Sequence, residues 1–487
     1  MRVTTGGQAT AEAVRAEGST AVIGERSISR GATPQRRTVA HAPASRWARP
    51  PVYVVLMILG LAANLLSGHS HRLGLPISPD RILIPLALIL LWRDPNRTRA
   101  RWGAVATLMV LFVAWTLASM IWHGNLLTPS TQFALLDRTV MPFVMFLVGP
   151  LIFSTTGRRD LLLKGLTAMG LYLGVTAVLE VFAPQLVFPR YIVDPEVGMH
   201  FGRARGPFAG AEAMAMTLAV CMGAALVLAG RQLPRWSTLG LIVAPLALFG
   251  VVLTGTRSAW LGVAAGILVA LVLSPALRRW IPAMLIAGTS GVVGAMIFLP
   301  SLVQSIFERS AANGPIYDRL SSNAAAFRVI SDLPLTGIGW RRFYPHGSEW
   351  ARQSDALPMN NAVIEVHSVI LSRATELGLP AVVVFLLIIV LGPLRSAVPT
   401  GPIPGHPDLP GWRALSGYAV SVWLVAGLFG PLSNPMPNYS VWLIAGVASW
   451  GLTTWATPAP KPPGGELAGE ADSPPRAYRA ARTTSVP

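Results

Sequence analysis

The chain has 487 residues, of which 52% are hydrophobic and only 13% are charged, whereas a soluble chain carries about 25% charged residues. Several apolar runs reach the roughly 20 residues that a helix needs to cross a bilayer. The net charge of +17 does not indicate nucleic-acid binding, because the basic residues lie in the tails and between the apolar runs, next to membrane headgroups.

The first element in chain order is the Arg- and Ala-rich stretch 1–50, which has no apolar run and is predicted to be a disordered, basic cytoplasmic tail. The apolar run that begins near Val52 lies too far from the N-terminus for a cleavable signal peptide and is predicted to be an uncleaved anchor. Residues 51–457 are predicted to form the transmembrane domain. Residues 458–487, rich in Pro, Gly and Ala, are predicted to form a second disordered cytoplasmic tail.

The apolar runs predict an all-α polytopic membrane protein with about 12 transmembrane helices, because a spanning segment must satisfy its backbone hydrogen bonds internally. The predicted spans are 52–68, 77–92, 103–122, 139–155, 161–183, 210–230, 236–253, 257–275, 280–300, 379–398, 414–430 and 437–456. The longest connection, 301–378, lies between the ninth and tenth spans.

Basic residues recur in every second connection. They are Arg93, Arg97, Arg99 and Arg101, then Arg158, Arg159 and Lys164, then Arg231 and Arg235, Arg278 and Arg279, and Arg395 and Arg413. By the positive-inside rule these connections and both termini are predicted to be cytoplasmic. The connections 184–209, 254–256 and 301–378 are then extracytoplasmic, and they bring Arg203, Arg257 and His367 to one face of the membrane.

Two of these three candidates are arginines that could bind an anion. Arg257 alone is most often an interfacial anchor, but the outer side disfavours arginine and the Thr254-Gly-Thr-Arg-Ser258 context supplies hydroxyls and flexible N–H groups. Arg203 and Arg205 could equally be solvated loop charges. A guanidinium suits pyrophosphate because it is permanently charged and donates in a bidentate fork.

The 301–378 segment is predicted to contain two helices. The first, Tyr317–Ile330, would be amphipathic through Leu320, Ala324, Phe327 and Ile330, and a Gly-rich turn follows at 335–340. The second, 362–377, would carry His367. A lone helical histidine is more often structural, but it could also transfer a proton near neutral pH. Glu365 would not face it on a helix, because the two are only two positions apart.

Other polar residues remain open. Asp137 and Arg138 could form a local ion pair or line a site, and Glu180 and Glu212 could each be functional. His69 and His71 have no further ligand cluster, so no metal site is expected. No cofactor motif is present, and no cofactor is expected.

Four stretches resemble segments of the O-antigen ligase and O-antigen polymerase family of bacterial membrane proteins. They are Arg203-Ala-Arg-Gly-Pro-Phe208, Thr254-Gly-Thr-Arg-Ser258 with Leu261-Gly262, Arg319 with Asp332-Leu-Pro-Leu-Thr-Gly-Ile-Gly-Trp-Arg-Arg-Phe343, and His367-Ser-Val-Ile-Leu371 with Glu376-Leu-Gly378. Two departures occur. Ser368 stands where the family usually has Asn, and Ala211-Glu212 stands where it usually has Pro-Asn.

The resemblance implies metal-independent transfer or polymerisation of a glycan from an undecaprenyl-pyrophosphate carrier to an acceptor glycan or lipid, at the outer face of the plasma membrane. It implies that Arg203 and Arg257 hold the pyrophosphate and that His367 activates the acceptor hydroxyl. Arg205, Arg319 and Glu376 are possible supporting residues. A multi-pass transporter or lipid-linked glycan flippase is the alternative, although the chain shows neither two related halves nor many mid-span charges.

Overall fold

The computed structural model describes residues 49–197, 202–231, 233–279, 281–301, 303–304, 308, 314–352, 365–399, 401, 403 and 405–451. Within them the chain is helical and contains no strand element. The predicted tails 1–50 and 458–487 lie outside the described residues, apart from Arg49 and Pro50.

The helices follow the predicted apolar runs. In chain order they are α1 (Val52–Asn64), α2 (Asp80–Arg93), α3 (Ala104–Trp122), α4 (Pro129–Leu135), α5 (Met141–Ile152), α6 (Thr156–Phe182), α7 (Ala211–Ala229), α8 (Pro234–Leu253), α9 (Arg257–Leu273), α10 (Pro275–Arg278), α11 (Ile281–Phe298), α13 (Gly314–Asp332), α14 (Phe343–His346), α15 (Val369–Leu377), α16 (Leu379–Ile389), α17 (Arg395–Ala397), α18 (Leu409–Phe429) and α19 (Pro435–Ala448). Each of the 12 predicted spans overlaps a helix.

The number of membrane crossings is a separate question from the number of helices. Among the described residues seven helices are long and apolar enough to cross a membrane, or eight if α1 and the 3₁₀ helix Ser67–Leu73, bent by 77°, form one span. Helices α2 and α19 have 14 residues each and α9 has 17, fewer than the roughly 20 that cross a bilayer unaided. The chain is therefore a helical membrane protein in which 12 crossings are not confirmed.

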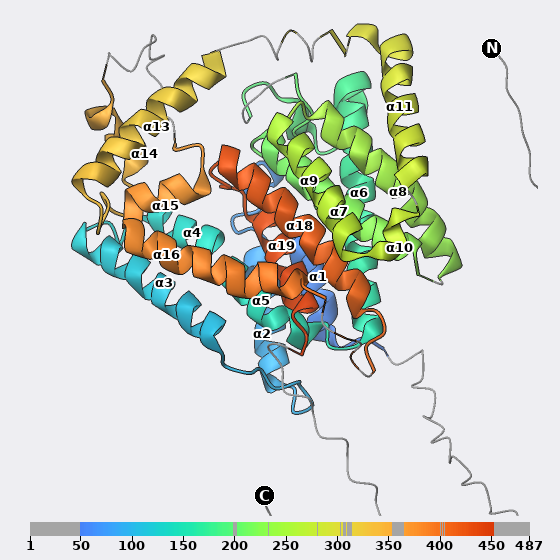
Figure 1. Cartoon of the computed structure of the whole chain (residues 1–487), viewed down its shortest axis with the longest axis horizontal. Helices are drawn as coiled ribbons and strands as arrows, with labels where there is room; N and C mark the ends of the chain where they lie inside the picture. Colours follow the sequence, from blue (N-terminus) through green and yellow to red (C-terminus); the bar gives the residue numbers. More distant parts are fainter. Residues whose placement is uncertain are drawn as a thin grey trace, which may run out of the picture. The chain divides into compact units, whose positions relative to one another are not determined.

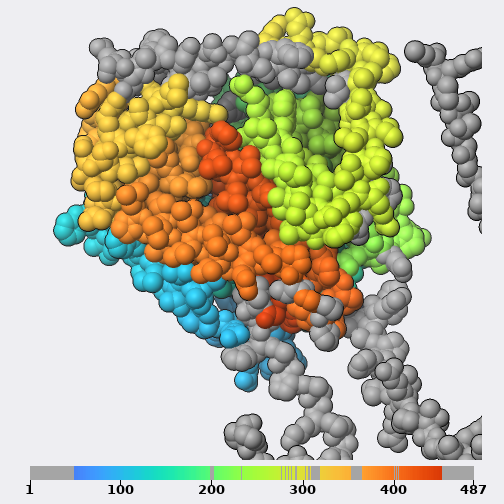
Figure 2. Space-filling model, viewed as in Figure 1, coloured from blue at the N-terminus to red at the C-terminus, as the bar shows by residue number. Residues whose placement is uncertain are grey.

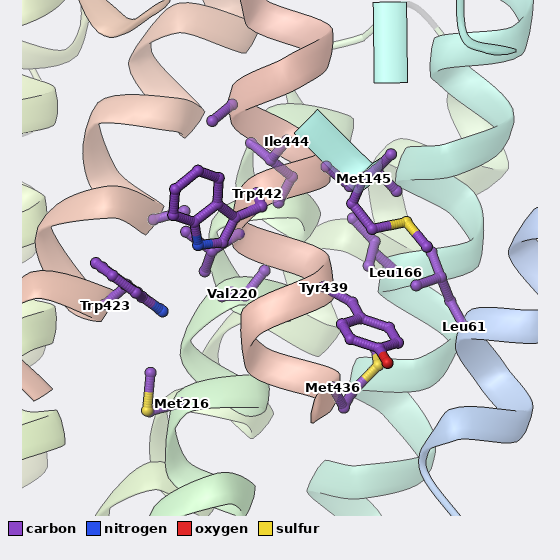
Figure 3. Close-up of a cluster of buried hydrophobic side chains, with 14 of the residues drawn as sticks. Leu61, Met145, Leu166, Met216, Val220, Trp423, Met436, Tyr439, Trp442 and Ile444 are labelled. Carbon is purple, nitrogen blue, oxygen red and sulfur yellow. The ribbon is translucent and has the colours of Figure 1, made fainter. Parts of the chain in front are cut away.

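Helix α19 forms the centre of the hydrophobic core. Every residue from Met436 to Ala448 is buried. The ring of Trp442 packs against that of Phe143, with a centroid distance of 5.3 Å. It also packs against the ring of Trp423, with a centroid distance of 5.9 Å (Figure 3). Buried aromatic pairs in these edge-on and tilted arrangements contribute beyond the area that they remove from solvent.

Close backbone contacts fix the helices around this centre. A Cβ on Gly446 of α19 would lie 2.3 Å from the Phe146 carbonyl oxygen of α5. A Cβ on Gly262 of α9 would lie 3.1 Å from the Val422 carbonyl oxygen of α18. Small residues allow such approach between membrane helices, where packing rather than the hydrophobic effect drives association. Gly262 therefore sets the position of α9, which begins at Arg257.

Helices α18 and α19 divide the helices into two groups (Figure 1). On one side lie α3 and α13 to α16, and on the other lie α6 to α11. In Figure 2 the red surface near the end of α18 lies between the orange and yellow surface of the first group and the green surface of the second. The end of α18 is therefore the place where residues from both groups can meet.

The first helix of the 301–378 segment is confirmed, but its predicted apolar face is wrong. Helix α13 buries Ala325, Ala326 and Val329, whereas Leu320 and Phe327 are 55% and 60% exposed. The small alanines allow α13 to approach its neighbours closely, and that contact decides which face is buried. The spacing of hydrophobic residues in the sequence had instead predicted a face that includes the bulkier Leu320 and Phe327.

The Gly-rich turn packs directly on the end of α15. The backbone N–H groups of Ile338 and Gly339 donate to the carbonyl oxygens of Thr375 and Glu376, both at 3.0 Å. Gly337 has φ 62°, and a Cβ there would lie 2.5 Å from the Thr375 carbonyl oxygen, so only glycine fits. The Pro-Leu-Thr-Gly-Ile-Gly stretch and the Glu-Leu-Gly stretch are therefore one packed unit.

Candidate functional site

Arg203 is bound to the turn between α8 and α9. Its Nε donates to the Thr254 carbonyl oxygen at 2.6 Å, and its Nη2 donates to the Thr256 hydroxyl at 2.8 Å. Gly255 lies between these two threonines with φ 60°, which allows the chain to reverse within three residues. The structure thus joins the connection before α7 to the Thr-Gly-Thr turn.

Arg257 is the first residue of α9 and is exposed. The residue before it, Thr256, is the one whose hydroxyl accepts from Arg203. The two arginines that the sequence singled out are therefore carried by segments in direct contact. The N-terminus of α9 also has backbone N–H groups without a partner inside the helix. These groups and the charge of Arg257 both favour an anion at this end.

Arg205 has a different environment from Arg203. It is 2% exposed, and its Nη2 donates to the carbonyl oxygens of Ile192 and Asp194 at 2.8 and 2.6 Å. The carboxylate of Glu180 accepts from the backbone N–H groups of Arg205 and Gly206. Arg205 and Glu180 thus hold the shape of the connection that presents Arg203.

Glu212 lies in the first turn of α7, close to the arginines. It interacts electrostatically with Arg319 of α13 and with Arg203. Its Oε1 is buried and has no hydrogen-bond partner among the described residues. A Cβ on Gly430, at the end of α18, would lie 2.1 Å from that oxygen. Glu212 therefore marks the point where α7, α13 and α18 converge with Arg203.

Glu365 is the hub of a second polar cluster. Its Oε1 accepts from Arg138 and from Arg341, and its Oε2 accepts from the Ser433 hydroxyl at 3.2 Å. Burial alone would raise the pKa of Glu365, but Arg138 and Arg341 outweigh that effect and lower the pKa below its ordinary value. Glu365 also interacts electrostatically with Glu212, so the two clusters are neighbours.

His367 does not lie on a helix, and the prediction that a helix over 362–377 carries it was wrong. Helix α15 begins at Val369, and Ser368 is its N-cap, with extended backbone and a hydroxyl that accepts from the Leu371 N–H at 3.4 Å. A serine cap starts a helix at the next residue and leaves the residue before it outside. Asparagine is an equally good cap, so an Asn at position 368 would start the helix at the same residue.

The buried face of α15 carries an arginine and a glutamate. Arg373 and Glu376 are each 2% exposed, and the Arg373 guanidinium lies 4.4 Å from the centroid of the Trp340 ring. Burial lowers the pKa of Arg373 to about 10, and burial raises that of Glu376 although Arg373 partly offsets it. Glu376 thus balances the charge of a buried arginine.

Asp137 and Arg138 do not pair with each other, which corrects one of the two interpretations of their sequence. Asp137 accepts from Arg81 at 2.6 Å and from the Tyr439 hydroxyl at 2.7 Å, whereas Arg138 binds Glu365. Both residues lie in the π-helical turn Leu136–Val140, and such turns are frequent at functional sites. Sequence spacing carried no signal for the partners of Arg138.

Several residues of the site were not found by sequence reasoning. Arg341 lies within the stretch 332–343 that resembles the family, but its sequence context gave it no role, and Arg373 and Ser433 match no motif. The described residues contain no group of three or more His, Cys, Asp or Glu side chains that could hold a metal ion.

The fold and the site define a helical membrane protein with a cluster of arginines and glutamates at the meeting point of its two helix groups. A comparison with family models matches residues 242–386 to the O-antigen ligase family. This match confirms the resemblance seen in the sequence and points to an enzyme that transfers glycosyl groups. It covers the Thr254–Arg257 turn and His367, while Arg203 precedes it. A comparison with curated proteins gave no match.

Proposed function

We propose that the protein transfers or polymerises a glycan from an undecaprenyl-pyrophosphate carrier to an acceptor hydroxyl at the outer face of the plasma membrane. The observation that carries this proposal is the contact of Arg203 with the turn that precedes Arg257. It joins two basic segments that are 51 to 53 residues apart in the chain. Arg319 extends the same positive region through its interaction with Glu212.

The chemical step is a substitution at the anomeric carbon of the donor glycan. The acceptor oxygen forms a bond to that carbon, the bond from the carbon to the pyrophosphate oxygen breaks, and undecaprenyl pyrophosphate leaves with the electron pair. His367 takes the proton of the acceptor hydroxyl. Arg203 and Arg257 stabilise the charge that develops on the leaving pyrophosphate.

Arginine side chains supply the positive charge in this proposal, and no metal ion is required. A guanidinium stays protonated in proteins and binds phosphate oxygens in a fork. We therefore expect glycan transfer to continue in the presence of a chelator of divalent cations. Strict dependence on a divalent ion would contradict this part of the proposal.

The orientation is also part of the proposal. The basic residues that recur in every second connection between the predicted spans support a cytoplasmic location for both termini. Arg203, Arg257 and His367 then face outward, where the carrier presents its glycan after translocation. Anionic membrane lipids would lie near the basic residues on the other side.

The experiment uses the full chain in lipid nanodiscs. The substrate is a lipid extract from a strain that lacks the protein, in which the unused carrier-linked glycan accumulates. Adding the protein is expected to release undecaprenyl pyrophosphate and to lengthen or attach glycan in equal amount. A flippase would instead move the carrier-linked glycan across a vesicle membrane and leave it chemically unchanged, which would contradict the proposal.

A further inference from the structure

The residues that flank His367 are each held in place. Val366 is 1% exposed and packs in a cluster with Ala325, Ala326, Val329 and Phe343. Ser368 caps α15. Glu365 lies two residues before His367, in the same short non-helical segment that ends at the cap Ser368. Whatever fixes Glu365 therefore also limits where His367 can lie.

Three elements far apart in the chain donate to Glu365. Arg138 comes from the π-helical turn between α4 and α5, Arg341 from the turn after α13, and Ser433 from the connection between α18 and α19. Charge-assisted hydrogen bonds of this kind are about twice as strong as neutral ones. Glu365 thus ties the 301–378 segment to helices of the membrane domain.

The backbone around two of these donors is strained. Arg341 has φ 61°, and Leu432, the residue before Ser433, has φ 50°. Left-handed backbone is unfavourable for residues other than glycine and persists where surrounding contacts hold it, often at functional sites. The unfavourable backbone conformations thus occur at Arg341, which donates to Glu365, and at the residue before Ser433, which also donates to it.

We propose that Glu365 is a positioning residue for His367, held by Arg138, Arg341 and Ser433 so that the histidine meets the acceptor hydroxyl. This inference rests on the proposed function, because it assigns to Glu365 a role in the same transfer. Glu365 does not itself touch the reacting atoms. It acts through the backbone of the segment that it anchors.

The first test measures kcat and KM of Glu365→Gln on the same lipid extract, per folded molecule. A displacement of about 1 Å at a reacting group costs about 10²-fold in rate, so kcat is expected to fall about 10²-fold. The donor KM is expected to stay near that of the wild type, because the pyrophosphate-binding arginines are unchanged. Glu349→Gln is the matched control: Glu349 is an exposed glutamate of the same segment that pairs with His346, and its variant is expected to keep wild-type kcat.

Two further variants separate positioning from folding. Glu365→Asp keeps the carboxylate and is expected to recover part of the lost kcat. Arg138→Gln combined with Glu365→Gln is expected to be no slower than Glu365→Gln alone, because the Glu365 substitution already removes the ion pair with Arg138. If Glu365→Gln does not fold, Ser433→Ala removes only one hydrogen bond to the carboxylate and is expected to lower kcat about 10-fold.

The outcomes distinguish this inference from the proposed function. Wild-type kcat in folded Glu365→Gln, or in Ser433→Ala, would overturn the positioning role while leaving glycan transfer intact. A higher donor KM at unchanged kcat would assign Glu365 to donor binding and would also overturn it. Absence of transfer by the wild-type protein would contradict the proposed function itself.

Discussion

Two arginines separated by a single alanine have different roles at the scale of single residues. Arg203 binds the turn that leads into Arg257, whereas Arg205 is buried and donates to carbonyl oxygens of its own connection. The alternating pattern Arg-Ala-Arg gives no indication of this difference. The burial and the hydrogen-bond partners of each side chain decide the difference. They lead to different expectations for Arg203→Lys and Arg205→Lys.

Arg203→Lys is expected to lower glycan transfer about 10- to 100-fold at normal expression. Lysine keeps the charge but loses the bidentate geometry, and hydrogen bonds to charged groups contribute about 1.5–3 kcal/mol each. Turnover per folded molecule on the lipid extract measures this loss. Arg190→Lys, at an exposed arginine of the same connection, serves as the control. Equal turnover of both variants would remove Arg203 from the site.

Arg205→Lys is expected to lower stability more than turnover. A lysine cannot reach the carbonyl oxygens of Tyr191, Ile192 and Asp194 together, so buried acceptors lose their donor. The thermal midpoint of the purified protein should fall, while the molecules that remain folded should lose less turnover than Arg203→Lys. An unchanged midpoint with reduced turnover would reverse the assignment.

At the scale of helices, the beginning of α18 is tied to α6 by a buried ion pair. Arg159 donates to the Asp408 carboxylate from Nε at 2.6 Å and from Nη2 at 2.7 Å, and both side chains are almost fully buried. The sequence placed Arg159 among the basic residues that set topology. The structure adds a packing role that charge patterns cannot reveal.

Asp408→Asn is expected to destabilise the protein by about 3–5 kcal/mol, because it leaves a buried arginine without its counter-charge. Burial alone would raise the pKa of Asp408, but the interaction with Arg159 outweighs burial. The pKa of Asp408 therefore lies below its ordinary value of about 3.9. The stabilisation is therefore present above about pH 4 and is lost as pH falls through the lowered pKa. Thermal unfolding between pH 7 and pH 3 should show a steeper acid loss in the wild type than in the variant.

Sequence patterns located the helices better than the site. Long apolar runs predict helices such as α3 and α7 because a membrane helix must be continuous and apolar. The beginning of α15 was misplaced because the cap at Ser368, rather than hydrophobic spacing, decides it. Glu365 was dismissed because a helix would have turned it away from His367, and its three donors come from elements that only the fold brings together.

At the scale of the whole molecule, the proposal requires that the 301–378 segment faces outward. The only cysteine in the sequence, Cys221, is fully buried, so a single introduced cysteine can be labelled without background. Ser348→Cys, an exposed position of this segment, is expected to react in intact cells with a maleimide that cannot cross the membrane. Ala100→Cys, exposed between α2 and α3, is expected to react only after the cells are opened. The reverse pattern would contradict the topology and the location of the site.

The most direct test of the outward-facing transferase is the turnover of His367→Ala per folded molecule, with binding of undecaprenyl pyrophosphate measured in the same preparation. If His367 takes the proton of the acceptor hydroxyl, turnover is expected to fall about 10²- to 10⁴-fold, the range for loss of a general base. Binding of undecaprenyl pyrophosphate is expected to be unchanged, because Arg203 and Arg257 remain. Near-normal turnover of the folded variant would contradict a role for His367 in the transfer.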